Sequence, residues 1–265
     1  MKNNTVPSTL VLQSHRTPLP YSWLSPCLDS VENWAKHNCF DYQFLGDEFF
    51  EIVPDWVIKK TKQQLVIATD IARLKWLQKY LASGYERVVW LDADFLIFAP
   101  ERFTLLAGES LPEKYALGRE VWVQAECSNN PPRKFKAYKK VHNAFLLFEQ
   151  GNCFLDFYAA HAERLLEKNQ GTMPPQFIGP KLLTALHNIV QCPVQEDAAM
   201  LSPWVIQDVL KGGGAALTLF LDKSPQQPAG ANLCSSLVGE LQLKENDISD
   251  LVELLLAEKG LVVTT

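Results

Sequence analysis

The stretch from Val88 to Ala99 places two carboxylates, Asp92 and Asp94, inside an otherwise apolar run. Apolar runs rich in valine and isoleucine are typical of strands that are buried on both faces of a mostly parallel sheet. An isolated carboxylate is costly to bury unless it is paired or binds a cation. In an extended chain the two side chains would point to the same side. The pattern therefore predicts a divalent cation site where this strand ends, with a short acidic turn as the alternative.

The composition of this 265-residue chain is that of an ordinary globular protein, with 47% hydrophobic and 21% charged residues. Such a length is sufficient for one α/β domain with a large core. The net charge of −5 leaves no basic footprint, so we expect no nucleic-acid partner. No window approaches about 18 consecutive apolar residues, and the first residues lack the apolar core of a signal peptide. We therefore expect no membrane span and a cytoplasmic location.

The six cysteines are spread along the chain, and none forms a Cys-x-x-Cys pair with another. This spacing argues against a structural zinc site and against a compact disulfide framework. Reduced thiols, as in a cytoplasmic enzyme, are the expected state.

The N-terminal part of the sequence predicts a strand–helix–strand unit. A strand at 10–12, a helix over about 25–37 and a strand at 41–44 follow one another. His15 and Arg16 come directly after the first strand, where open α/β sheets place their ligands. These two residues are therefore candidates for binding a nucleotide or its phosphates, and an exposed polar loop is the alternative.

A second helix is predicted to begin at Thr69-Asp70 and to end near Gly84, shortly before the strand that carries Asp92. A Thr or Asp at a helix start accepts hydrogen bonds from the free backbone amides. Asp70 and Arg73 lie three residues apart and therefore share one face of this helix. They could form a helix cap with a surface ion pair, or they could face the site at the strand end.

The order of Asp-x-x-Arg at 70–73 and Asp-x-Asp at 92–94 resembles that of the GT-A glycosyltransferases, in particular the mannosyltransferase-like family with a "sugar-binding region containing DXD motif". The resemblance implies an α/β fold of the GT-A (Rossmann-like) type, with a mostly parallel central sheet flanked by helices. It also implies transfer of a sugar, with retention, from a nucleotide-diphosphate sugar donor. Asp92 and Asp94 would then be catalytic and would hold Mn²⁺ or Mg²⁺, which both prefer oxygen ligands. Asp70, Arg73 and Ala93 would face the nucleotide sugar.

Two later segments resemble the same family. His142 and Asn143 lead an apolar strand over 142–148, and the resemblance implies that the Asn143 side chain meets the donor or acceptor sugar in a catalytic or binding role. His142 could ligate a metal as a neutral imidazole or could be structural. Gly179 and Pro180 begin a helix that the resemblance places near the acceptor, and its free amides suit an anion or a hydroxyl. A well-formed helix start is the alternative for these two residues.

A second pair of carboxylates, Glu196 and Asp197, lies before the segment that begins at Met200. Adjacent residues cannot share one face of a strand, so one of the pair at most points into a site. Asp197 is the candidate, because a carboxylate would stabilise an oxocarbenium-like transition state. A polar loop is the alternative. Residues 211–214 lack the Gly-Lys-Ser/Thr ending of a P-loop and are expected to end a helix with left-handed glycines.

The polar segment 128–140 carries five Lys and Arg residues. We expect it to be a solvated loop, with a lid that closes over a diphosphate as the alternative. Its basic side chains could share the charge of that diphosphate.

We expect one catalytic domain that spans residues 1–265. Residues from about 8 to 125 would bind the metal and the nucleotide sugar, and those from about 126 to 220 would form the acceptor side. A C-terminal appendage would follow from 221 to 265. The acceptor would be a glycan, a lipid or a small molecule.

Two other functions are compatible with the Asp-x-Asp pattern. Phosphatases of the haloacid dehalogenase type also place this motif after an apolar strand, but on the first strand of the fold and with a later acidic pair that is not evident here. A GT-A-like protein could also bind a nucleotide or a glycan without turning it over.

Overall fold

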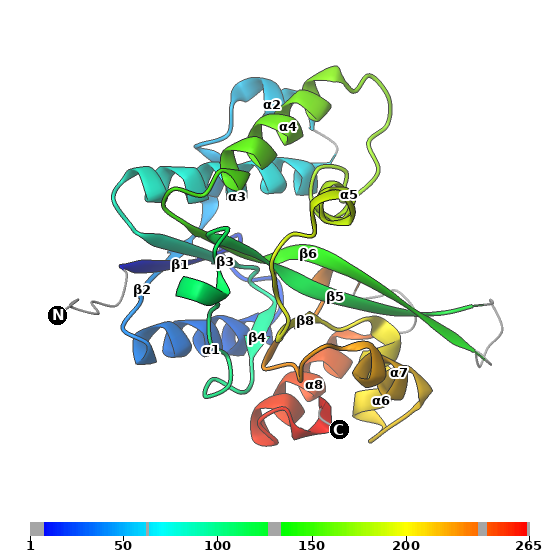
Figure 1. Cartoon of the computed structure of the whole chain (residues 1–265). Coiled ribbons are helices and arrows are strands. Elements are labelled where there is room, and N and C mark those ends of the chain that lie inside the picture. Colours follow the sequence, from blue (N-terminus) through cyan, green and yellow to red (C-terminus); the bar gives the residue numbers. More distant parts are fainter. Residues whose placement is uncertain (1–7, 62–63, 127–133, 238–242, 264–265) are drawn as a thin grey trace.

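The computed structural model describes residues 8–61, 64–126, 134–237 and 243–263, and its centre is a six-stranded sheet in the order β2-β1-β3-β6-β5-β7 (Figure 1). The parallel pairs are β1 with β2, β1 with β3 and β5 with β7, whereas β6 runs against both β3 and β5. The expected α/β fold with a mostly parallel central sheet is therefore confirmed. The strands are β1 (Thr9–Ser14), β2 (Asp41–Leu45), β3 (Arg87–Leu91), β5 (Tyr115–Ala125), β6 (Phe135–Glu149) and β7 (Val194–Gln195).

A second sheet has three short strands in the order β4-β9-β8, namely β4 (Phe95–Ile97), β9 (Gly230–Asn232) and β8 (Ala198–Met200). The expectation that a buried strand ends at Asp92 and Asp94 agrees with β3, which ends at Leu91, whereas the apolar residues after Asp94 enter this second sheet. The chain leaves the central sheet after Leu91, turns at Asp92–Asp94 with the Phe95 amide donating to the Asp92 carbonyl at 2.9 Å, and continues as β4. Apolar periodicity does not distinguish one long strand from two short ones that enter different sheets. Because the chain turns here, the alternation expected for an extended strand does not set the directions of the two carboxylates.

Helices cover both faces of the central sheet (Figure 1). One face packs against α2 to α5, and the other lies over α1 and α6 to α8. Successive side chains of β3 point to opposite faces, so Val88 and Trp90 belong to the first core and Val89 belongs to the second. The helices are α1 (Leu24–His37), α2 (Asp55–Lys60), α3 (Leu65–Ala82), α4 (Phe154–Lys168), α5 (Pro180–Val190), α6 (Pro203–Leu210), α7 (Ala215–Lys223) and α8 (Glu245–Ala257), with 3-10 turns at Asp47–Phe50, Gly108–Ser110, Ser235–Leu237 and Leu261–Val263.

Two predicted boundaries near the site differ from the structure. Helix α3 begins at Leu65, so Thr69 and Asp70 lie inside it rather than at its start, and the Thr69 hydroxyl bonds back to the Leu65 carbonyl at 3.1 Å. Residues 135–140 belong to β6, because they pair with β5 in a long hairpin, and so they are not a loop. Residues 128–133 of that expected loop lie outside the described residues, as does any closing motion assigned to them.

Among the described residues, no helix is both long and apolar enough to cross a membrane. The division of the chain into donor half, acceptor half and appendage stays a prediction. However, β9, which falls in the expected appendage, pairs with β4 directly after the Asp92–Asp94 turn.

Candidate active site

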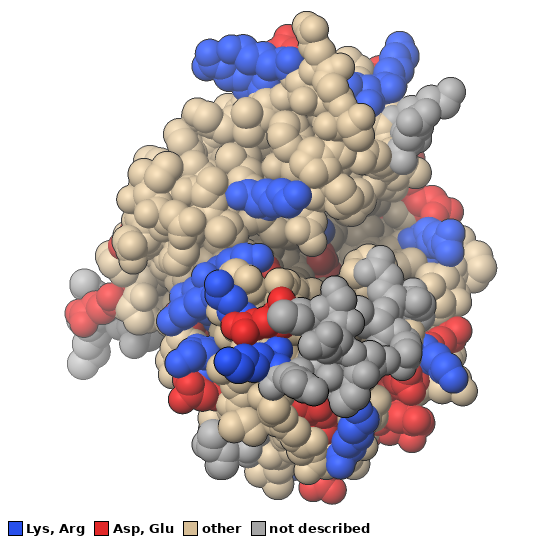
Figure 2. Space-filling view, turned by 90° about the vertical axis from the view of Figure 1, so that its right-hand side faces the viewer, with Lys and Arg blue, Asp and Glu red and all other residues tan. Residues whose placement is uncertain are grey.

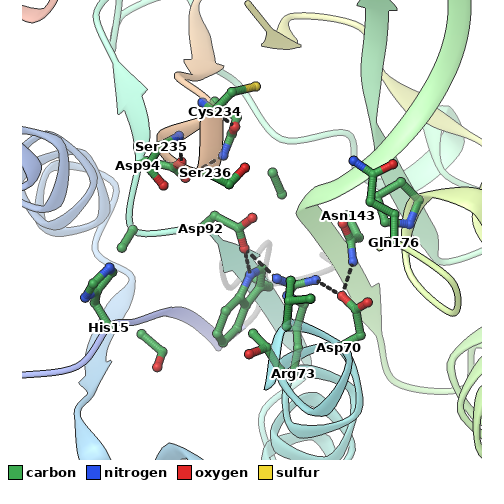
Figure 3. Close-up of a pocket in the computed structure, with 18 of the residues that line it drawn as sticks. His15, Asp70, Arg73, Asp92, Asp94, Asn143, Gln176, Cys234, Ser235 and Ser236 are labelled. Carbon is green, nitrogen blue, oxygen red and sulfur yellow. Dashed lines mark hydrogen bonds and ion pairs between the residues drawn. The ribbon is translucent and has the colours of Figure 1, made fainter. Parts of the chain in front are cut away.

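A cavity of about 750 Å³ opens where β1, β2 and β3 end (Figure 3). His15 and Arg16 enter it from the end of β1, Asp47 follows β2, and Asp92 to Asp94 follow β3. Carboxyl ends of neighbouring parallel strands meet at one edge of a sheet, and open α/β folds bind ligands there. The structure thus brings the predicted residues after β1 and β3 to one cavity, Ala93 included.

Asp92 is fixed by both its backbone and its side chain. Its amide donates to the Ala144 carbonyl at 3.0 Å, and its carbonyl accepts from Gln13 Nε2 at 3.0 Å. Its Oδ1 accepts from Arg73 Nη2 at 2.8 Å and from Trp90 Nε1 at 2.6 Å. Oδ2 is left without a hydrogen bond among the described residues, and 27% of the side chain is exposed. Asp92 therefore presents one oxygen to the cavity.

Asp94 is held from the second sheet. Asn232 Nδ2 donates to its Oδ1 at 2.5 Å, and the Ser235 amide donates to its Oδ2 at 2.7 Å. Burial raises the pKa of the Asp94 carboxyl, and the neighbouring charge of Asp92 raises it further. Each carboxylate oxygen can accept more than one bond, so both remain able to serve a cation.

A buried network behind Asp92 joins α3 to β6. Asp70 Oδ1 accepts from Arg73 Nη1 at 3.0 Å and from Asn143 Nδ2 at 2.8 Å. The Arg73 guanidinium also lies 5.0 Å from the centre of the Trp90 ring. The prediction that Asp70 and Arg73 share a helix face is confirmed, but the pair is 5% exposed at each residue and so is not a surface ion pair. Burial raises the pKa of Asp70 to about 6, although Arg73 and Asn143 act to lower it.

The first turn of α5 closes against this network. Pro180 lines the cavity at the first position of the helix, as the sequence predicts for a helix start. A Cβ on Gly179 would lie 2.6 Å from Asp70 Oδ2 and 2.9 Å from Asn143 Nδ2. Glycine at 179 therefore permits the close approach of the backbone to both side chains.

His142 is structural and is not available as a metal ligand. Its Nε2 donates to the Ala198 carbonyl at 3.0 Å, while its Nδ1 accepts from the Ala144 amide at 3.1 Å. Complete burial lowers the pKa of this imidazole to about 4, which keeps the ring neutral. The β5–β6 register shifts beside it, from Leu117 opposite Leu146 to Gly118 opposite His142. Asn143 lies in the extra residues of this bulge, and bulges are a common way to re-aim a side chain next to a site.

Asp197 does not line the cavity, contrary to its candidate role at the reacting sugar. It is buried between β7 and β8, where its Oδ1 accepts from Gln195 Nε2 at 2.6 Å. Glu196 turns the other way and forms a two-point ion pair with Arg119 at 2.6 and 2.7 Å. Both carboxylates thus have partners within the fold, and neither lines the cavity.

The glycines after α6 end that helix, as predicted. Gly212 and Gly213 have positive φ angles of 77° and 142°. The Asp208 carboxylate accepts hydrogen bonds from the first amides of α7 at Ala216 and Leu217. This turn is therefore a helix connection, and its residues do not line the cavity.

Among the cavity residues that were not predicted from the sequence, two groups stand out. Asn232, Ser235 and Ser236 arrive at the end of β9, a strand of three residues without any apolar alternation. Glu120 and Trp122 reach the cavity from β5. For Glu120 and Trp122 the sequence did contain a signal: they alternate with valines at 121 and 123, which are buried, and this alternation indicates a strand with two different faces.

The carboxylates suit a hard divalent cation. Among the described residues, no group of three or more His, Cys, Asp or Glu side chains is placed to hold a metal ion. Magnesium, however, is commonly bound by one or two carboxylates together with substrate phosphates and water. Asp92 and Asp94 are two carboxylates at the cavity that could meet this requirement. Burial raises the pKa of Asp94, the neighbouring charge of Asp92 raises it further, and a bound cation would offset both effects.

No protein-family model and no curated protein matches this sequence. Among solved structures, the chain is similar to a glycosyltransferase involved in the glycosylation of the major capsid of PBCV-1, with a TM-score of 0.47 and 11% identity over 94% of this chain and 100% of the other. It is also similar to mouse xyloside xylosyltransferase 1, with a TM-score of 0.41 and 8% identity over 86% and 98%, and to A197 from STIV, with a TM-score of 0.30 and 11% identity over 71% and 80%. All three TM-scores lie below 0.5, so these similarities alone establish neither the fold nor the activity.

Proposed function

We propose that this chain is a metal-dependent glycosyltransferase that moves a sugar, with retention, from a nucleotide-diphosphate sugar to an acceptor. The observation that carries the proposal is the placement of Asp92 and Asp94 at the turn after β3, beside one large cavity. A cavity of about 750 Å³ lies in the range of small-molecule and cofactor sites.

Asp92 and Asp94 would hold Mn²⁺ or Mg²⁺. Bound there with the donor diphosphate, the cation would act as a Lewis acid and stabilise the charge of the leaving nucleotide diphosphate. The protein contributes orientation: Arg73 and Trp90 fix Asp92, while Asn232 and the Ser235 amide fix Asp94.

Arg73 acts through Asp92 in this proposal. Its two terminal nitrogens are taken up by Asp70 and Asp92, so its charge is already balanced inside the protein. Arg16 lies in the loop after β1 and lines the cavity, which makes it the better partner for a nucleotide phosphate.

Asn143 would contact the sugar through its amide oxygen. Its Nδ2 donates to Asp70, which orients the side chain at the cavity wall. A hydroxyl group of the donor or acceptor sugar could then donate to Oδ1. Pro180 and Gln176 border the same side of the cavity.

The first experiment measures nucleotide binding by calorimetry, with UDP and GDP, each with and without Mn²⁺. We expect one nucleotide to bind only with the cation, and we expect Asp92→Asn and Asp94→Asn to lose this binding. Asp222→Asn is a matched control, because this side chain is 64% exposed and does not line the cavity. Binding that is indifferent to the cation, or that both cavity variants retain, would contradict the proposal.

Turnover is tested separately by incubating the protein with UDP and GDP sugars and following the released sugar by proton NMR. The anomeric configuration of the first product distinguishes retention from inversion. Metal-dependent nucleotide binding without any consumption of donor, in the presence of a glycan mixture, would indicate a binding protein. Metal-dependent cleavage of p-nitrophenyl phosphate without nucleotide binding would indicate a phosphatase.

A further inference from the structure

One wall of the cavity is formed by the β5–β6 hairpin, and its exposed face has not been assigned a role. Along β5 the side chains alternate: Val121 and Val123 are buried in the core, while Glu120, Trp122 and Gln124 line the cavity. Their cross-strand partners on β6 are Lys140, Tyr138 and Lys136. The strand period of two therefore places an indole between a carboxylate and an amide on the cavity side.

This wall is well separated from the strand that leads to His15 and Arg16. The order β1-β3-β6-β5 puts three strand spacings between β1 and β5. At about 4.8 Å per spacing, that is roughly 14 Å across the sheet. Asp92 and Asp94 follow β3, between these two walls. The cavity can thus hold one molecule on the β1 side of the carboxylates and another on the β5 side.

The chemistry of the hairpin wall matches a sugar ring. A pyranose has an apolar face of C–H groups and a rim of hydroxyls. The half-buried Trp122 offers a flat apolar surface, and Glu120 and Gln124, two residues away on either side, offer oxygens that accept hydrogen bonds from hydroxyl groups. A long hydrocarbon chain would place apolar groups against that carboxylate and amide, and so it fits this wall poorly.

The charge at the hairpin wall favours a neutral occupant there. The described lining residues include five Asp or Glu side chains but three Lys or Arg side chains. Of these cations, Arg73 is paired with Asp70 and Asp92, and Lys140 lies 3.7 Å from Glu120. Figure 2 shows both acidic and basic side chains around the hollow on this side of the molecule. Among the described hairpin residues that line the cavity, Lys140 is the one basic side chain, and the adjacent Glu120 offsets its charge.

We propose that the β5–β6 hairpin is the acceptor subsite and that the acceptor is a neutral glycan, stacked on Trp122 and hydrogen-bonded by Glu120 and Gln124. The identification of the bound glycan as the acceptor rests on the proposed glycosyltransferase function. The glycan-binding wall itself is argued from the hairpin alone.

The test uses a printed array of neutral and acidic oligosaccharides, probed with the full chain and followed by calorimetry on each bound glycan. We expect neutral glycans to bind. Trp122→Ala should weaken that binding about tenfold or more, since an aromatic contact and its buried area are lost. Trp122→Phe should restore most of it, and Glu120→Gln should weaken it. Trp56→Ala is the matched control, because Trp56 is 38% exposed on α2 and does not line the cavity.

The same variants are measured for metal-dependent nucleotide binding, which separates the two proposals. Nucleotide binding that survives Trp122→Ala while glycan binding falls would support the subsite. Loss of both in a folded Trp122→Ala protein would assign the indole to the donor and overturn the inference. An array on which no neutral glycan binds would also overturn the inference. The same holds if calorimetry shows that dodecyl phosphate or a peptide is the ligand whose binding depends on Trp122. Glycan binding without any nucleotide binding would leave the subsite standing and refute the transferase.

If Trp122→Ala does not fold, as judged by its thermal unfolding, Trp122→Phe and Glu120→Gln decide the matter. Unchanged glycan affinity in Glu120→Gln together with unchanged affinity in Trp122→Phe would then overturn the inference. A loss in Glu120→Gln, with the aromatic variant close to wild type, would support it.

Discussion

The backbone amide of Ser235 donates a hydrogen bond of 2.7 Å to the carboxylate of Asp94, across 141 positions of sequence. The Asn232 side chain donates to the other oxygen of the same carboxylate and accepts from the Cys234 amide at 2.9 Å. The orientation of Asp94 therefore depends on a segment that lies far from it in the chain.

Replacing Asn232 with alanine should disturb Asp94 more than it disturbs the fold elsewhere. Loss of a hydrogen bond to a buried charged acceptor destabilises a protein by about 1.5–3 kcal/mol. Residues that orient a metal ligand typically change metal affinity about 10–100-fold when mutated. We expect Asn232→Ala to show both effects in urea unfolding and in Mn²⁺-dependent nucleotide binding. Asn188→Ala, at an exposed site on α5, should show neither. A variant that keeps wild-type affinity for cation and nucleotide would remove Asn232 from this role.

Gly179 provides a second test of the site, which depends on steric fit rather than on charge. A methyl group at 179 would stand 2.6 Å from Asp70 Oδ2, so either α5 or the Asp70–Asn143 pair must move. We expect Gly179→Ala to reduce donor turnover at least about tenfold, because small displacements of positioned groups are costly in catalysis. Gly171→Ala is the control, since a Cβ there meets nothing within 4 Å. Equal turnover in the two variants would show that the close approach does not matter for function.

Asp70 should make stability depend on pH in an unusual direction. Its pKa is raised from 3.8 to about 6 in the folded protein, so between these values the native state binds more protons than the unfolded state. Its contribution to the free energy of unfolding is therefore fully present below about pH 4 and is lost as the pH rises through about 6, amounting to at most about 3 kcal/mol. Urea unfolding of wild type and Asp70→Asn across this window measures it. A difference between the two proteins that does not change with pH would refute the assignment.

His142 should act in the opposite direction. Its pKa is lowered from 6.5 to about 4, so the unfolded state binds the extra proton in this window. Its contribution is present above about pH 6.5 and is lost as the pH falls through about 4, again by up to about 3 kcal/mol. The wild type should therefore lose stability relative to His142→Gln as the pH is lowered. Exposed His161 supplies the control variant His161→Gln, which should follow the wild type. A slope shared by all three proteins would contradict the assignment to His142.

The relation between Asp70 and Arg73 could be predicted because it depends on the helical period. Side chains three residues apart share a face wherever the helix begins, so the error of one turn in the start of α3 did no harm to it. The position of Asp92 and Asp94 after a buried strand was predictable for a similar reason, since the apolar run before them marks the central strand.

The partners of Asp94 could not be predicted, because they are set by tertiary pairing. Strand β9 contains Gly230, Ala231 and Asn232 and carries no pattern of its own, so its position follows from its antiparallel pairing with β4. That Asp197 lies outside the cavity lining could not be predicted for a related reason. Its neighbour Gln195 supplies a partner within the fold, and a sequence does not reveal which carboxylates are satisfied in this way.

The turn between β3 and β4 has a mechanical consequence. Asp92 is anchored in the six-stranded sheet and Asp94 in the three-stranded one, although a single residue separates them. A cation bound by both would cross-link the two sheets, so cation binding would also stabilise the position of one sheet relative to the other. Amide hydrogen exchange in β9 should then slow when Mn²⁺ and nucleotide are added, even though Asn232 of β9 lies 138 positions from Asp94 in the sequence.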